Sequence, residues 1–192
     1  MATSLSLSTL SDLPADVRVP SYARSDLTPG IVHIGLGNFH RAHQAWYLHR
    51  LMDQGLAHDW AIIGAGVRPA DAAARDKMLA QDCLTTLIEL DPAGKSAEVT
   101  GSMIDFVPVQ EGNAPLIAAM TQPAIRIVAL TVTEGGYYQT GTGDFDAAHA
   151  DMMHDAANPD TPRSAFGAMI AALRARRDAD AGPFTCQSCD NL

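Results

Sequence analysis

One stretch decides the fold of this chain, and it reads Gly30-Ile31-Val32-His33-Ile34-Gly35-Leu36-Gly37-Asn38-Phe39-His40-Arg41-Ala42-His43-Gln44. A short apolar run of strand type ends at two glycines two residues apart, and a segment with helical spacing follows at once. A strand, a glycine turn and a helix in this order are typical of a dinucleotide-binding unit, in which a pyrophosphate lies on the helix N-terminus. His40 stands where G-x-G-x-x-G has its third glycine, so the regular fingerprint is broken at its last position.

The composition is that of an ordinary folded domain. The 192 residues are 47% hydrophobic, enough for one sizeable core or one domain with extensions. The 13 basic and 22 acidic residues give a net charge of −9, which argues against nucleic acid or an anionic membrane surface as the main partner. No apolar run approaches the roughly 18–20 residues of a membrane helix. Three cysteines (Cys83, Cys186 and Cys189) are an odd, low number, so we expect a reducing compartment and a cytoplasmic protein.

The chain divides into an arm and one domain. Residues 1–28 are polar and contain two prolines, and we expect an extended N-terminal arm there. Residues 29–192 alternate between strand and helix patterns. Strands are expected at 30–36, 60–67, 125–132 and 184–188, and helices at 39–54, 72–81, 114–120, 146–156 and 164–178. This alternation predicts an α/β, Rossmann-like fold with a mainly parallel sheet flanked by helices.

One part of the domain departs from that alternation. Residues 84–90 and 99–109 are rich in strand-forming residues, and Asp91-Pro92-Ala93-Gly94 between them is a turn signal, so we expect an antiparallel β insertion. Ligands of parallel sheets bind at the carboxyl ends of the strands. Three of the expected ends carry unusual residues, at 35–40, 133–136 and 189–191.

The first turn of the helix after the glycines is rich in potential positive charge. His40, Arg41 and His43 lie there, and cations at a helix N-terminus are unfavourable unless an anion is near. A bound diphosphate would supply that anion; solvent or neighbouring acids would serve equally well. Metal binding by these histidines with His49 is disfavoured, because spacings of three and six residues do not bring all three to one helical face.

Asp71 is the candidate acid for a cofactor ribose. A carboxylate after the second strand accepts hydrogen bonds from ribose hydroxyls and repels a 2′-phosphate, which favours NAD. Asp71 follows Gly37 by 34 residues, more than the usual spacing of about 20, and a long intervening helix would account for part of the excess. Arg68 leaves NADP open, and a solvated turn aspartate is the alternative interpretation.

Two further motifs stand near strand ends. Thr133-Glu134-Gly135-Gly136 closes the strongest expected strand; its glycines permit close approach of a ligand, and Glu134 could act on protons or orient water. A loop turn with a surface acid explains the same residues. Cys186 and Cys189 form a C-x-x-C pair on the last strand, where neither a second pair of zinc ligands nor a redox helix is expected.

Together these segments resemble the mannitol 2-dehydrogenase family of polyol-specific long-chain dehydrogenases. The resemblance covers about residues 10–192 and rests on five ordered motifs, at 30–44, 64–68, 81–82, 131–137 and 188–192. In that family the form G-x-G-x-F-H-R-A-H-Q replaces the third glycine, so His40 is expected.

The resemblance implies an enzyme that interconverts a sugar alcohol and a ketose with NAD, or with NADP in some members. Mannitol and fructose are the type pair, and relatives act on arabinitol or fructuronate. It also implies a role for Asn191 in polarising the reacting oxygen of the substrate, as an amide N–H donor can. The implied cofactor-binding residues are Gly35, Leu36, Gly37, Asn38, Phe39, His40, Arg41, Asp71, Glu134 and Gly135. Some relatives have two adjacent acids where Ala70 and Asp71 stand here.

The family's general base is a lysine in a second, mostly helical catalytic domain. Lys77 and Lys95 are the only lysines of this chain, and neither lies in a matching motif. We therefore expect the cofactor half of a longer enzyme, which binds NAD but lacks turnover without its C-terminal catalytic domain. A nucleotide-binding module without redox chemistry is the alternative from another class.

Overall fold

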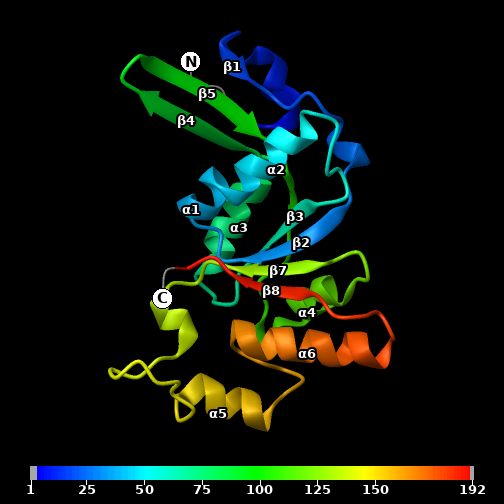
Figure 1. Cartoon of the computed structure of the whole chain (residues 1–192), viewed down its shortest axis with the longest axis vertical. Coiled ribbons are helices and arrows are strands. Elements are labelled where there is room, and N and C mark those ends of the chain that lie inside the picture. Colours follow the sequence, from blue (N-terminus) through cyan, green and yellow to red (C-terminus); the bar gives the residue numbers. More distant parts are fainter. Residues whose placement is uncertain (1–3, 191–192) are drawn as a thin grey trace.

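The computed structural model describes residues 4–190, and five parallel strands form its main sheet (Figure 1). The strand order is β6-β3-β2-β7-β8. The strands are β2 (Pro29–Ile34), β3 (Ala61–Ala65), β6 (Met103–Phe106), β7 (Ile127–Leu130) and β8 (Thr185–Ser188). The chain steps outward from β2 in one direction through β3 and β6, then returns to its other side with β7 and β8. This is the switch-point topology of a Rossmann-like sheet, so the predicted fold class is confirmed.

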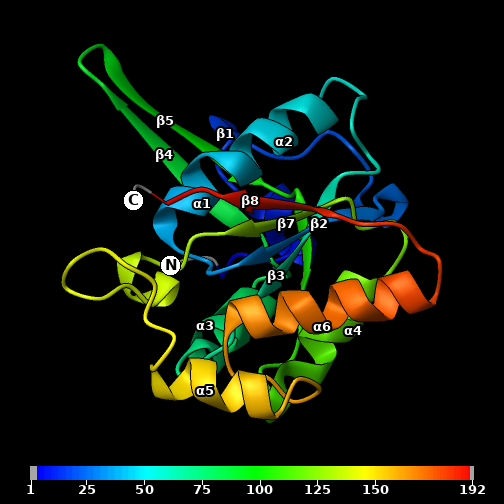
Figure 2. The ribbon, with the colours of Figure 1, turned by 60° about the horizontal axis from the view of Figure 1, so that its bottom comes forward.

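Helices cover both faces of this sheet. Helices α1 and α2 lie on one face, and α4 and α6 lie on the other (Figure 2). The helices are α1 (Asn38–Ala42), α2 (Gln44–Met52), α3 (Asp71–Leu79), α4 (Ala114–Thr121), α5 (Ala150–Ala157) and α6 (Ala165–Asp178). The side chains of β2 alternate between the two cores: Val32 and Ile34 pack with α4 and α6, whereas Ile31 packs with Ala45 of α2. Burial on both faces explains why this strand is a continuous apolar run.

A second, three-stranded sheet has the order β1-β5-β4, with β1 at Val17–Arg18, β4 at Thr85–Asp91 and β5 at Gly94–Thr100. Strands β4 and β5 form an antiparallel hairpin that projects from the domain (Figure 1). The Asp91 carboxylate accepts the Ala93 N–H at 2.8 Å and closes its turn. The predicted insertion is present, but β5 begins earlier than expected, and β6 belongs to the main sheet. The sequence did not indicate where β5 begins, because the first residues of β5 are exposed and polar and lack an apolar alternation.

The segment expected as an extended arm contains short elements. These are η1 (Leu7–Asp12), β1 and η2 (Arg24–Asp26). Strand β1 pairs in parallel with β5, and the Leu7 N–H donates to the Asp82 carboxylate at 2.8 Å. The segment therefore lies along the hairpin and the loop before it.

The prediction of one continuous helix over 39–54 is wrong, because the helix breaks at His43. This residue has φ −119° and ψ −86° and separates α1 from α2. Its ring Nδ1 lies 2.8 Å from the Phe39 carbonyl oxygen, which also accepts the His43 N–H at 3.0 Å. The side chain thus adds a second donor to a carbonyl that the helix already uses, and the backbone turns. Among the described residues, no helix is both long and apolar enough to cross a membrane.

Candidate functional site

The carboxyl ends of β2, β3 and β7 open into a cavity of about 370 Å³. Three predicted site residues line it: Gly35 after β2, Asp71 at the start of α3, and Gly135 in the loop after β7. Thr131 and Thr133 line it as well. The structure therefore brings together residues from three segments that are far apart in the sequence, at the edge where the strand order reverses.

The two glycines of the turn have different reasons to be glycine. Gly35 has φ +93°, and a Cβ there would overlap the carbonyl oxygen of Thr131. Gly37 has no heavy atom within 4 Å of a built Cβ, so the space beside it is open. Its N–H donates to the Gly35 carbonyl at 3.1 Å. Gly35 therefore sets the backbone, whereas Gly37 leaves room for a ligand.

Asp71 is held in place at this edge. Its carboxylate accepts the Arg68 N–H at 2.9 Å and lies against Gly66, where a Cβ would overlap the aspartate side chain. The 34-residue spacing from Gly37 does not separate the two motifs, because Asp71 lines the same cavity as Gly35. The Arg68 side chain is 60% exposed, and Arg68 lines the same cavity, so a carboxylate and a guanidinium both lie at this edge.

The remaining predicted residues divide between the core and a second hollow. Leu36 packs into the core, with its side chain against Gly64. Phe39 is 56% exposed and, with His40, lines a hollow of about 500 Å³ between the α1–α2 segment and β8. The Arg41 guanidinium donates to the Asn38 side-chain oxygen.

His40 is buried and carries no charge at neutral pH. Its ring is 1% exposed and stacks on His33, with 3.5 Å between ring centroids. Burial, reinforced by the neighbouring imidazole, holds the pKa of His40 far below its usual range, and burial lowers the pKa of His33 to about 4. The positive charge expected in this turn therefore comes from Arg41 and not from His40.

Sequence reasoning missed a carboxylate that joins two strand ends. Asp190 follows β8 and accepts hydrogen bonds from the Val132 N–H at 3.0 Å and the Tyr137 hydroxyl at 2.8 Å. It also accepts the N–H of Thr133, a β-branched residue at φ +63°. One signal in the sequence could have indicated Asp190. It stands directly after the last predicted strand, at the same carboxyl edge of the sheet as the other site residues. Asn191 lies outside the described residues, as does the side chain of Glu134.

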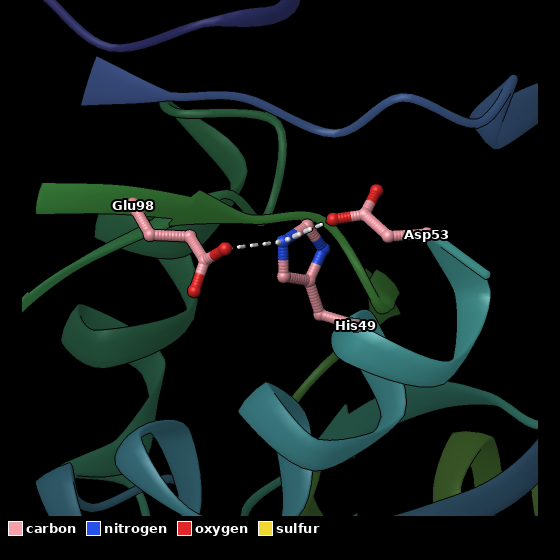
Figure 3. A group of neighbouring side chains, drawn as sticks. All are labelled: His49, Asp53 and Glu98. Atoms are coloured by element: carbon pink, nitrogen blue, oxygen red, sulfur yellow. Dashed lines mark ion pairs between the residues drawn. The ribbon is translucent and has the colours of Figure 1, made fainter. Parts of the chain in front are cut away.

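One group of possible metal ligands occurs in residues 4–190, and it lies away from this edge. Figure 3 shows His49 of α2 between the carboxylates of Asp53 and Glu98. The Nε2 atom of His49 lies 3.3 Å from the Asp53 carboxylate and 3.7 Å from the Glu98 carboxylate. Glu98 already accepts the indole N–H of Trp46 at 2.6 Å and the Arg50 guanidinium at 2.9 Å. Burial alone would raise the pKa of Glu98, but these hydrogen bonds and the nearby charge of Arg18 act together against burial, and the pKa of Glu98 is lowered. We interpret the group as an ion-pair cluster, because a bound cation would face the Arg50 charge on the same carboxylate.

The sheet order and the glycine turn define a Rossmann domain of dehydrogenase type. The protein-family model described as the mannitol dehydrogenase Rossmann domain matches residues 29–192. The chain therefore belongs to the mannitol dehydrogenase family. The family prediction is thereby confirmed.

Relatives and solved structures agree. Mannitol 2-dehydrogenase of Cereibacter sphaeroides is 63% identical over 90% of this chain and 36% of its own length. The polyol:NADP oxidoreductase of Gluconobacter oxydans is 43% identical over 96% of this chain and 38% of its own. The solved ternary complex of Pseudomonas fluorescens mannitol 2-dehydrogenase with NAD and D-mannitol has a TM-score of 0.92 at 43% identity, covering 98% of this chain and 39% of that one. The chain thus spans less than half the length of these relatives.

Proposed function

We propose that this chain is the cofactor-binding half of an oxidoreductase that interconverts a sugar alcohol and a ketose of the mannitol and fructose type. The observation that carries the proposal is the shared cavity of Gly35, Asp71 and Gly135 at the switch point of the sheet. Relatives with matching sequence include mannitol 2-dehydrogenases and one polyol:NADP oxidoreductase. Fructuronate and arabinitol remain substrates that the same cofactor half would serve.

The residues present fit a nicotinamide dinucleotide. The open space beside Gly37 admits a pyrophosphate against backbone, and Arg41 in the same turn supplies a positive charge. The Asp71 carboxylate, fixed by its hydrogen bond to Arg68, would accept from the ribose hydroxyls. When bound, the nicotinamide would accept the hydride of the alcohol.

We propose NAD as the preferred cofactor, since a fixed carboxylate at this position repels a 2′-phosphate. Arg68 at the rim works in the other direction and supports some use of NADP. The proposed cofactor-binding set also includes further residues of the motifs at 30–44 and 131–137. These are Leu36, Asn38, Phe39, His40 and Glu134.

Asn191 is proposed to donate its side-chain N–H to the reacting oxygen and so stabilise the developing alkoxide. The general base is proposed to be a lysine of the second, helical domain that the family resemblance implies, so the 192-residue chain alone should bind cofactor without turnover. A cytoplasmic location fits Cys83, Cys186 and Cys189, which are all free thiols in the structure.

Titration calorimetry of the chain with NAD and NADP tests the proposal. We expect saturable binding of NAD, weaker binding of NADP, and no mannitol oxidation. A folded sample that binds neither dinucleotide would refute the proposed function. Mannitol oxidation by the 192-residue chain would refute the assignment of the base to another domain.

A further inference from the structure

We infer that Thr131, held by His33, fixes the glycine turn for the dinucleotide, which makes both of them positioning residues of the cofactor site. The inference rests on the proposed function and extends it to two residues outside the motif glycines. The inference is argued from a series of side-chain contacts. The series runs from α2, through β2 and the end of β7, to the Gly35 carbonyl.

The first contact is between Thr131 and the turn. The Thr131 hydroxyl donates to the Gly35 carbonyl oxygen, which also accepts the Gly37 N–H at 3.1 Å. The Thr131 N–H donates to the Ile34 carbonyl at 2.9 Å, so the backbone of Thr131 is fixed by the sheet ladder. Two donors from different segments therefore orient one peptide group of the turn. That peptide joins Gly35 to the residue before Gly37.

The second contact is between His33 and Thr131. His33 Nε2 lies 2.8 Å from the Thr131 hydroxyl oxygen. That hydroxyl has one hydrogen, which goes to Gly35, so the imidazole must be the donor and carry its proton on Nε2. Nδ1 of the neutral ring is then an acceptor, and the atom 3.0 Å from it is the Gln44 side-chain oxygen. The Gln44 amide therefore donates to this ring only when it is turned by 180°, so that its NH₂ group faces Nδ1. With the Gln44 amide in that orientation, the hydrogen bonds run in one direction and end on the Gly35 carbonyl.

The surroundings keep this chain of contacts in one state. His33 is fully buried, and the neutral ring of His40 covers one of its faces. Thr131 lines both the 370 Å³ cavity and the 500 Å³ hollow, so it stands between the two. Its hydroxyl is the polar group through which the buried side chains reach the turn beside the open space at Gly37.

Substitution at Thr131 tests the inference. Thr131→Val keeps the shape and removes the hydroxyl, whereas Thr131→Ser keeps the hydroxyl. We expect Thr131→Val to weaken NAD binding about three- to tenfold, the worth of one hydrogen bond, while Thr131→Ser stays within about twofold of the parent chain. Adenosine has no pyrophosphate and should bind all three proteins alike in an NMR titration. Thr121→Val is the matched control, because its hydroxyl donates to the Ile117 carbonyl within α4.

His33→Phe tests the route. It should weaken NAD binding in the same direction, and the double variant with Thr131→Val should bind no more weakly than Thr131→Val alone, because His33 acts through Thr131. NAD binding by Thr131→Val equal to that of the parent chain would overturn the inference, and so would an equal loss of adenosine binding.

Hydrogen exchange separates the inference from the proposed function. In the ligand-free chain, the Gly37 amide should exchange faster in Thr131→Val than in Thr131→Ser. Equal exchange rates refute the positioning role even if the chain binds NAD. A parent chain that binds no dinucleotide refutes the proposed function, while faster Gly37 exchange in Thr131→Val would still support control of the turn.

Discussion

Two buried histidines in this molecule have opposite surroundings. His33, on the central strand, contacts the neutral side chains of Gln44 and Thr131 and lies beside a hollow at the sheet edge. His49, on α2, lies between the carboxylates of Asp53 and Glu98 and accepts or donates a hydrogen bond with the Tyr22 hydroxyl at 2.8 Å. By residue type alone, His49 has the richer set of chemical neighbours.

The difference shows that charged neighbours do not by themselves define a site. The Glu98 carboxylate is already bound by Trp46, Arg50 and Arg18, so its charge is used to join α2, the hairpin and β1. At the sheet edge, the neutral groups near His33 orient backbone next to open space. A candidate ligand site needs open space beside groups that are not already paired, and an indole and two guanidinium groups already bind the Glu98 carboxylate.

The largest expected effect separates the two glycines of the sheet-edge turn. Gly35→Ala should lower the free energy of unfolding by about 3 kcal/mol, because its Cβ overlaps the Thr131 carbonyl and φ is +93°. Gly37→Ala should change it by less than about 0.5 kcal/mol, since nothing lies near its Cβ. Urea denaturation measures both, and equal values for the two variants would contradict the division of roles.

The next effect concerns the ion-pair cluster. Glu98→Gln should destabilise the chain by about 2–3 kcal/mol, below the full value for a buried pair because Arg50 and Arg18 are 42% and 54% exposed. Glu89→Gln on the exposed face of β4 is the control, with little expected change. Zinc or manganese should leave the melting temperature of the parent chain unchanged. A rise that disappears in Glu98→Gln would mean that the cluster is a metal site.

A somewhat smaller effect distinguishes the stacked histidines by pH. The folded-state pKa of His33, about 4, lies below the unfolded value of about 6.5, so its contribution to stability is complete above pH 6.5 and is lost as the pH falls toward 4. From pH 7 to 5 we expect a loss of roughly 2 kcal/mol from this ring and a similar loss from His40.

Urea denaturation of His40→Phe at both pH values checks this expectation. The variant should lose part of the pH dependence and keep the part that comes from His33 and His49, because burial lowers the pKa of both of these rings as well. A parent chain as stable at pH 5 as at pH 7 would mean that the two rings are not buried as neutral groups.

The smallest effect concerns cofactor choice at the edge. Asp71→Asn keeps an oxygen to accept the Arg68 N–H and removes the charge. The ratio of NADP to NAD affinity should rise about tenfold, or about 1.4 kcal/mol, because the repulsion of a 2′-phosphate is lost. Calorimetry with both cofactors measures it. An unchanged ratio would mean that Asp71 does not contact the cofactor. That result would not bear on the other residues of the cavity.

Most of the fold could be predicted because local patterns are strong where strands are buried on both faces. The run at 30–36 covers all of β2 except Pro29, the run at 125–132 contains β7, and the helix expected at 164–178 agrees with α6. The break at His43 could not be predicted, since it depends on a side chain that bonds one particular carbonyl. The start of β5 was hidden because exposed polar strands carry no apolar alternation.

The candidate site divides in the same way. Gly35, Asp71 and Gly135 could be chosen from motifs and found to share one cavity, whereas Asp190 and Thr131 could not. Their roles depend on contacts between strands that are adjacent in space and separated by more than fifty residues in sequence, and no local pattern records such contacts.

The sequence by itself determined the fold class and the family, because glycine spacing, apolar periodicity and motif order are properties of the chain. Only the tertiary structure decided the charge and partners of each histidine. Desolvation and hydrogen bonding depend on which segments pack together. Burial lowers the pKa of both His40 and His49, but His40 stacks on His33 whereas His49 lies between two carboxylates.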